Sequence, residues 1–136
     1  MENFVIKSCL TAVETKMILP IKNAKEELIL KNNKIQEEIP ELEALVATQK
    51  RQLDVLHRTI NELLQTRRME TPLTTELRKV YDEIGEPYEG IVQNLLGRKE
   101  IIQKNIQMIA EYDLRLSVIN HVISHFETAQ SSSDNI

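Results

Sequence analysis

A seven-residue repeat of apolar side chains between residues 21 and 67 constrains this chain more than any other feature. One stripe reads Ile21, Leu28, Ile35, Leu42, Gln49, Leu56 and Leu63, and the other reads Lys25, Asn32, Ile39, Val46, Leu53 and Ile60. Alternating steps of three and four residues keep one face of a helix turned toward a partner helix. We call these positions the seam. In the second half of this run the second stripe is mainly Ile or Val and the first is mostly Leu, which favours two strands in parallel assemblies and does not exclude a hairpin or bundle.

The composition supports long helices. The chain has 136 residues, which suits one domain, with three Gly, four Pro and no Trp. So few helix breakers among many Leu, Ile, Glu, Lys and Gln residues indicate long helices rather than a compact mixed fold. The formal net charge of −4 weakly opposes nucleic-acid binding, since phosphate contacts need a surplus of Lys and Arg.

Cysteine use and hydropathy suggest an intracellular protein. The single cysteine, Cys9, cannot form an internal disulfide, and the chain has no Asn-x-Ser/Thr sequon. No apolar run approaches the roughly 18 residues that a membrane span needs. We therefore expect a cytoplasmic or nuclear protein with no membrane contact.

The expected order is four helices in one helical coiled-coil domain over residues 1–129, at about 3–18, 21–68, 72–84 and 87–128, with a disordered tail over 130–136. The first helix carries the stripe Ile6, Leu10, Val13 and Met17, and Pro20 ends or kinks it. Pro40 either starts a new helix or kinks a continuous one. We favour the kink, because the seam passes Pro40 in phase.

The stretch after residue 69 predicts a small helix within the turn. Thr71 is a suitable N-cap before Pro72, and Gly85 suits a helix end. The last helix then starts at Pro87, and its seam reads Ile91, Leu95, Arg98, Ile102, Asn105, Ile109, Tyr112, Leu116, Ile119, Ile123 and Phe126. Further apolar residues flank that seam, at Val92, Ile101, Ile106, Met108 and Val122. This face is wider than a two-stranded seam buries.

The predicted fold is all-α: an elongated helical hairpin or coiled-coil bundle with a short N-terminal helix and a small helix in the turn. Because its apolar faces exceed what one hairpin covers, we expect self-association or a helical partner. The expected interaction seam comprises Leu28, Ile35, Leu42, Val46, Leu53, Leu56, Ile60, Leu63, Ile91, Leu95, Ile102, Ile109, Leu116, Ile119, Ile123 and Phe126.

Candidate chemistry is weak by comparison. His121 and His125 lie four residues apart and could share a metal, but no third ligand has matching spacing, so solvated histidines are the better interpretation. Cys9 has no accompanying His or acid signature and suits a packing role. The basic residues could meet an acidic partner or phosphates, although solvation is the simpler interpretation. They are Lys50, Arg51, Arg58, Arg67 and Arg68.

Two polar seam residues are more informative. A buried Asn32 would fix helix register at a cost in stability, and Lys25 stands at an equivalent position. The alternative is that this part of the helix frays or faces solvent.

The sequence contains no phosphate-binding loop, nucleophile elbow or His-Glu-x-x-His motif. We therefore expect no enzyme, cofactor, metal or small-molecule substrate. The leading hypothesis is a structural subunit that oligomerises or joins other helical subunits of a larger intracellular assembly. The alternative is a helical chaperone or adaptor that masks an amphipathic helix of a client protein.

Overall fold

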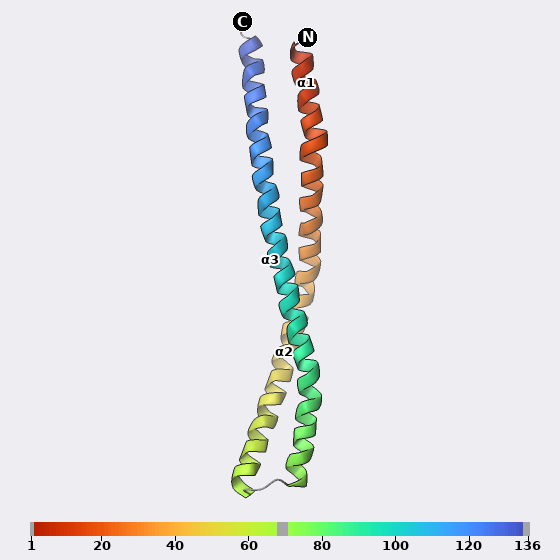
Figure 1. Cartoon of the computed structure of the whole chain (residues 1–136), viewed down its shortest axis with the longest axis vertical. Helices are drawn as coiled ribbons and strands as arrows, with labels where there is room; N and C mark the ends of the chain where they lie inside the picture. Colours follow the sequence, from red (N-terminus) through yellow and green to blue (C-terminus); the bar gives the residue numbers. More distant parts are fainter. Residues whose placement is uncertain (1, 68–70, 135–136) are drawn as a thin grey trace. The chain divides into compact units, whose positions relative to one another are not determined.

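The computed structural model describes residues 2–67 and 71–134, and these residues form an all-α helical hairpin. The helices are α1 (Glu2–Val13), the π-helix η1 (Glu14–Ile18), α2 (Leu19–Arg67) and α3 (Pro72–Asp134). Figure 1 labels α1, α2 and α3. The described ranges contain no strand. The all-α hairpin is therefore confirmed, and its long helices pair within one chain.

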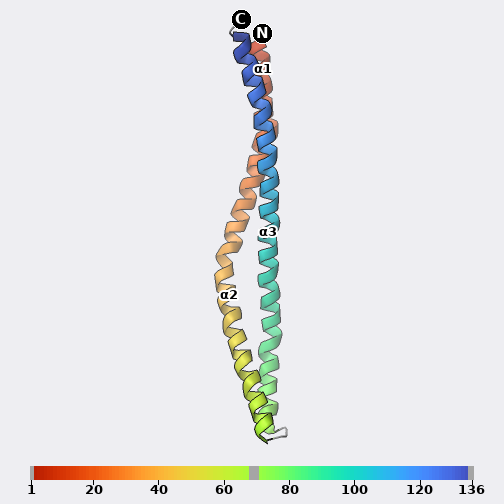
Figure 2. The same cartoon turned by 90° about the vertical axis from the view of Figure 1, so that its left-hand side faces the viewer.

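The chain divides into two compact units. Unit 1 is built from Met1–Lys34 and Ile102–Ile136, and unit 2 from Ile35–Ile101. In both units the two helices are antiparallel, so residues early in one helix lie opposite residues late in the other. Leu10 and Glu127 line one groove of unit 1, and the His57 and Tyr81 rings of unit 2 lie 6.2 Å apart. Figures 1 and 2 both show α3 beside the opposing helix within each unit.

One extra residue separates the seam of α1 from that of α2, and η1 absorbs it. Val13 is half-buried and Ile18 is 7% exposed, although the step from one to the other is five residues instead of the usual three or four. The Leu19 N–H donates to the Glu14 carbonyl, which is the wide hydrogen bond of a π-turn. Met17, the predicted seam residue, is 50% exposed. That assignment is wrong because the heptad phase shifts by one residue here.

Pro20 explains why the chain tolerates a wide turn at this place. Proline has no N–H, and its ring clashes with the carbonyl four residues earlier in a regular α-helix. A π-turn directly before Pro20 relieves that crowding. The helix therefore neither ends nor restarts at Pro20, and α1, η1 and α2 follow without a gap.

The second internal proline, Pro40, lies inside α2. The helix is continuous through it, as the unbroken seam predicted, and Ile39 and Leu42 on either side are both half-buried. The alternative of a new helix starting at Pro40 is wrong.

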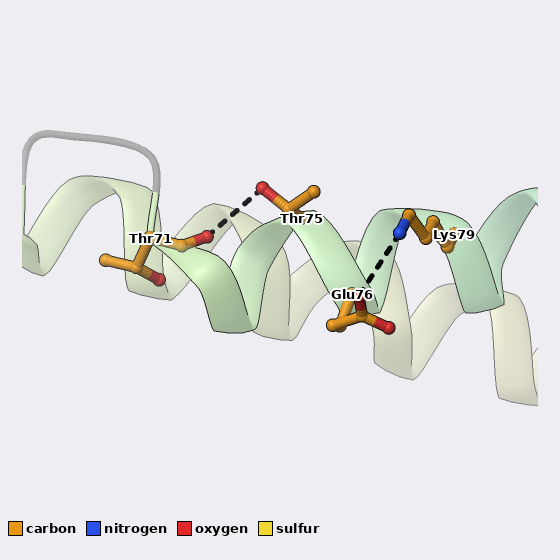
Figure 3. Close-up of polar contacts among 4 residues, drawn as sticks. All are labelled: Thr71, Thr75, Glu76 and Lys79. Carbon is orange, nitrogen blue, oxygen red and sulfur yellow. Dashed lines mark hydrogen bonds and ion pairs between the residues drawn. The ribbon is translucent and has the colours of Figure 1, made fainter.

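The start of α3 is closed by a reciprocal cap. The Thr71 hydroxyl accepts from the Thr74 N–H at 3.3 Å, and the Thr74 hydroxyl accepts from the Thr71 N–H at 2.9 Å. Thr74 is fully buried. Figure 3 shows the next turn, where the Thr75 hydroxyl donates to the Thr71 carbonyl and Lys79 pairs with Glu76. These bonds satisfy donors that a helix start otherwise leaves unpaired, which confirms the predicted cap.

The turn helix at 72–84 and the last helix at 87–128 are not separate. Helix α3 continues through Gly85 and Pro87, because Ile84, Tyr88 and Ile91 keep the seam spacing and are half-buried. Packing of this face outweighs the local preference of Gly and Pro to end a helix. The C-terminal prediction also differs: α3 extends to Asp134 instead of giving way to a disordered tail at 130, and residues 135–136 lie outside the described ranges.

Candidate interaction surface

The predicted seam residues line the inner face of the hairpin. Four are buried, with 6–8% of their surface exposed: Leu53, Ile60, Leu95 and Ile102. Eleven more are half-buried: Leu28, Ile35, Leu42, Val46, Leu56, Leu63, Ile91, Ile109, Leu116, Ile119 and Ile123. Phe126, the last predicted position, is 37% exposed. Because the opposite helix of the same chain already covers part of most of these side chains, the apolar surface most open to another chain lies at outer positions.

Asn32 is the polar centre of the unit 1 seam. Its side chain is 6% exposed. The Asn32 Nδ2 donates to the Ile102 carbonyl at 3.3 Å, and its Oδ1 accepts from Asn105 Nδ2 at 2.8 Å. A buried amide needs such partners, because burying it unpaired costs free energy. These bonds form only when residue 32 faces residues 102 and 105, so they fix the register of the two helices.

Ion pairs flank the seam in both units. In unit 1 the half-buried Lys25 contacts Asp113, with Nζ 2.5 Å from Oδ1. In unit 2 Arg98 pairs with Glu38, and Lys99 lies 3.1 Å from Glu43. Each pair joins opposite helices. Pairs this exposed contribute up to about 1 kcal/mol, so they favour one alignment more than they stabilise the fold.

Gln49 is the counterpart of Asn32 in unit 2. It occupies a half-buried seam position, and its Oε1 is buried without a hydrogen-bond partner among the described residues. An unpaired buried acceptor costs about 1–3 kcal/mol. Gln49 therefore weakens the seam that contains it.

Large apolar side chains lie on the outside of the hairpin, mostly in unit 1. Of the seventeen that are exposed among the described residues, eleven belong to unit 1 and six to unit 2. The most exposed are Leu114 at 67% and Leu30 at 63%. The eleven residues of unit 1 are spread over both of its helices, and six of them lie within residues 106–126 of α3. Apolar surface that continues over several helical turns is typical of binding sites. The outer face of unit 1 is therefore the best candidate for an interaction surface.

A second stripe of residues runs along α3 in unit 1, beside the seam. Its six members are all exposed and follow one another in steps of four, three, four, three and four: Lys104, Met108, Glu111, Arg115, Val118 and Val122. We call this set the outer stripe. Its spacing is that of a helix-packing face, although the chain's own second helix packs on the seam instead.

The histidine pair lies away from the seam. His121 and His125 are exposed, with Nε2 atoms 3.2 Å apart and rings in a T-shaped arrangement. Two nitrogens fall short of the four ligands of a structural zinc site. The described residues hold no group of three or more His, Cys, Asp or Glu that could bind a metal ion.

The remaining candidates are scattered over the surface. Cys9 is exposed rather than packed. The predicted basic residues Lys50, Arg51, Arg58 and Arg67 are exposed, and Arg68 lies outside the described residues. The Arg51 Nε donates to the Ala47 carbonyl of its own helix at 3.4 Å. Within the described ranges, none of these four basic side chains forms an ion pair with an acidic side chain.

Two features of this surface were not predicted. Met108 and Val122 were expected only as flanking apolar residues, and the outer stripe that joins them was not, although its 4-3-4-3-4 spacing is present in the sequence. Gln49 was expected only as an interruption of the apolar seam. That the Gln49 oxygen lacks a partner depends on the opposing helix, which the sequence of α2 alone does not specify.

No protein-family model matches the chain, and comparisons with curated proteins and with solved structures give no match. The helices of residues 2–67 and 71–134 include none with a stretch long and apolar enough to cross a membrane.

Proposed function

We propose that this chain is a non-enzymatic structural protein of the cell interior that binds other helices, in a second copy or in helical subunits of a larger assembly. The observation that carries the proposal is the outer apolar surface of unit 1. Met108, Val118 and Val122 are all 43% exposed or more, and they belong to the outer stripe of α3.

Burial of this surface supplies the driving force. Full burial of a Val, Leu or Met side chain is worth about 1.5–3 kcal/mol, so several such residues can support association. A helical partner fits best, because the outer stripe has the spacing of alternating three and four residues that matches a second helix. The Asn32 bonds support the proposal by holding α3 in one register, so that the outer residues keep fixed positions.

The test is the absolute mass of the purified chain by light scattering over a concentration series, with chemical cross-linking in cell extract beside it. Val118→Glu, at an exposed position of the outer stripe, should reduce association strongly. The control is Leu96→Glu in unit 2. The Leu96 side chain is 53% exposed, which is close to the 57% of Val118. The proposal fails if the wild type is monomeric at every concentration and all three chains give the same cross-links.

The alternative function, a chaperone or adaptor for an amphipathic helix, would use the same surface. It predicts a monomer that takes up an added amphipathic peptide, with Val118→Glu reducing the uptake. A fixed oligomer that ignores such peptides would favour the structural role. The two experiments together separate these functions.

A further inference from the structure

The outer stripe is complementary to itself. Its central members are Glu111 and Arg115, with Met108 before them and Val118 after them. When a second stripe is laid antiparallel on the first, Glu111 of each copy meets Arg115 of the other. The same alignment sets Met108 against Val118, and both contacts occur twice, as a two-fold axis requires.

We propose that a second copy of this chain is the occupant of this surface, with the two α3 helices packed antiparallel along their outer stripes and the two-fold axis passing close to residue 113. This inference rests on the proposed function and names the partner. Charge complementarity supports it, because the alignment pairs both central charges with opposite ones and sets Met108 against Val118. At each end of the stripe Lys104 lies beside Val122, so its alkyl stem covers that side chain while its ammonium stays in water.

The exposures fit this arrangement. Met108 is 43% exposed, Val118 57% and Val122 44%, so each has surface left for a second helix. The Arg115 guanidinium lies over the ring of the half-buried Tyr112, with its carbon 5.7 Å from the ring centroid. That contact already restricts the Arg115 side chain, so ordering it in an interface costs less conformational entropy.

Pairing of Glu111 with Arg115 inside one helix is the competing arrangement, since the two residues are four apart. Such a pair is weak and leaves the apolar members of the stripe in water. The antiparallel dimer uses the same two charges and also covers the apolar members. Both arrangements pair Glu111 with Arg115, but only in the dimer does the measured molecular mass depend on these two charges.

The size of the contact sets its strength. The stripe from residue 104 to residue 122 covers 18 steps of the helix, or about 27 Å at 1.5 Å per residue. One helix pair of this length buries less than the roughly 800 Å² per partner of a standard interface. We therefore expect a weak dimer that dissociates on dilution, and more easily at high salt because exposed charges are screened.

The experiment is sedimentation equilibrium of the full chain at low salt, with helix content checked by circular dichroism. The wild type should approach twice the 15.8 kDa of one chain as the concentration rises. Glu111→Arg and Arg115→Glu each place two pairs of like charges in the interface, so each should raise the dissociation constant by about tenfold or more. The double reversal, E111R with R115E, should restore it to within about threefold of the wild type.

The control is Glu83→Arg, which makes the same change of charge at an exposed position of unit 2 and should leave the dissociation constant unchanged. If Glu111→Arg loses helix content, Glu111→Gln provides the milder test, with a smaller rise expected. The proposed dimer is overturned if single reversals have no effect, or if the double reversal does not restore association.

These failures are distinguishable from failure of the proposed function. An oligomer that ignores all charge reversals but is dissociated by Val118→Glu would overturn this geometry and leave the function standing. A monomer that binds another helical protein through Val118 would overturn the self-association alone. A monomer whose cross-links do not respond to Val118→Glu would overturn both.

Discussion

Each unit has a side-chain amide within its seam, Asn32 in the second stripe and Gln49 in the first, with opposite results. In unit 1, Asn32 is bonded to the Ile102 carbonyl and to Asn105. In unit 2, the buried Oε1 of Gln49 has no described partner. A polar residue within an apolar seam thus specifies the helix register where the opposite helix supplies a hydrogen-bond partner. Where it supplies none, the polar residue only destabilises the helix pair.

The outer faces differ in the same direction. Ion pairs flank the seam in both units, but among the described residues unit 2 has six exposed large apolar side chains against eleven in unit 1. Unit 1 combines a register fixed by buried bonds with an apolar outer face. The proposed interaction surface therefore lies in the unit whose helix register is fixed by buried hydrogen bonds.

The largest expected effect tests whether the two apolar cores are equivalent. Ile102→Ala in unit 1 and Leu53→Ala in unit 2 should each cost about 2–4 kcal/mol, because both side chains are 6–8% exposed. Hydrogen exchange measured by mass spectrometry gives the local opening free energy of each unit. The control Leu96→Ala, at an exposed position, should change the opening free energy of unit 2 by less than about 0.5 kcal/mol. A cost confined to one unit's residue would show that the cores are unequal.

The next effect concerns Asn32. Asn32→Ala should lower the opening free energy of unit 1 by about 1–3 kcal/mol, since Asn105 and the Ile102 carbonyl lose a buried partner. Faster exchange is expected in peptides around both residue 32 and residue 105. The matched control is Asn33→Ala, one residue along and exposed. Equal effects of the two substitutions would contradict the role of Asn32.

Gln49 should respond in the opposite sense. Gln49→Leu removes the unpaired oxygen and extends the apolar seam, so the stability of unit 2 should rise by about 1 kcal/mol. Urea denaturation followed by circular dichroism measures the change. Gln52→Leu makes the same replacement at an exposed position and should be close to neutral. A loss of stability in Gln49→Leu would mean that the oxygen has a partner after all.

The smallest effect belongs to the ion pairs. A double-mutant cycle with Glu43→Gln and Lys99→Met should give a coupling energy below about 1 kcal/mol that shrinks as salt is added. The same cycle at Lys25 and Asp113 should give a similar value in unit 1. A coupling energy well above 2 kcal/mol, or one insensitive to salt, would contradict this prediction, because it would mean that the charges are shielded from solvent.

Much of the fold was predictable because helix packing depends on spacing. The three- and four-residue steps through Pro40 correctly predicted a continuous α2, and the all-α hairpin followed from the two long seams. The error at Gly85 and Pro87 came from giving local propensity priority over the same spacing. Ile84, Tyr88 and Ile91 keep the register there, so the seam again indicated a continuous helix.

The remaining differences depend on the opposite helix. That Asn32 is buried and paired depends on Asn105, seventy-three residues away, and no periodicity within α2 reveals this. The same holds for Gln49. The outer stripe depends on which of two adjacent faces the second helix covers, because both have helix-packing spacing. The sequence predicted surplus apolar surface but could not assign it to one side of α3.

The wide turn at η1 also has a consequence for how this chain tolerates changes in length. A one-residue deletion in most of α2 would rotate every later seam residue off its face. Deletion of Thr15 would instead bring Val13 and Ile18 to the regular four-residue spacing and remove the need for a π-turn. Pro20 would then lie in an ordinary α-helix, where its ring crowds the carbonyl four residues before it. Pro40 and Pro87 already lie in such a setting inside α2 and α3, so the chain can lose this one residue without rotating its later seam residues off their face.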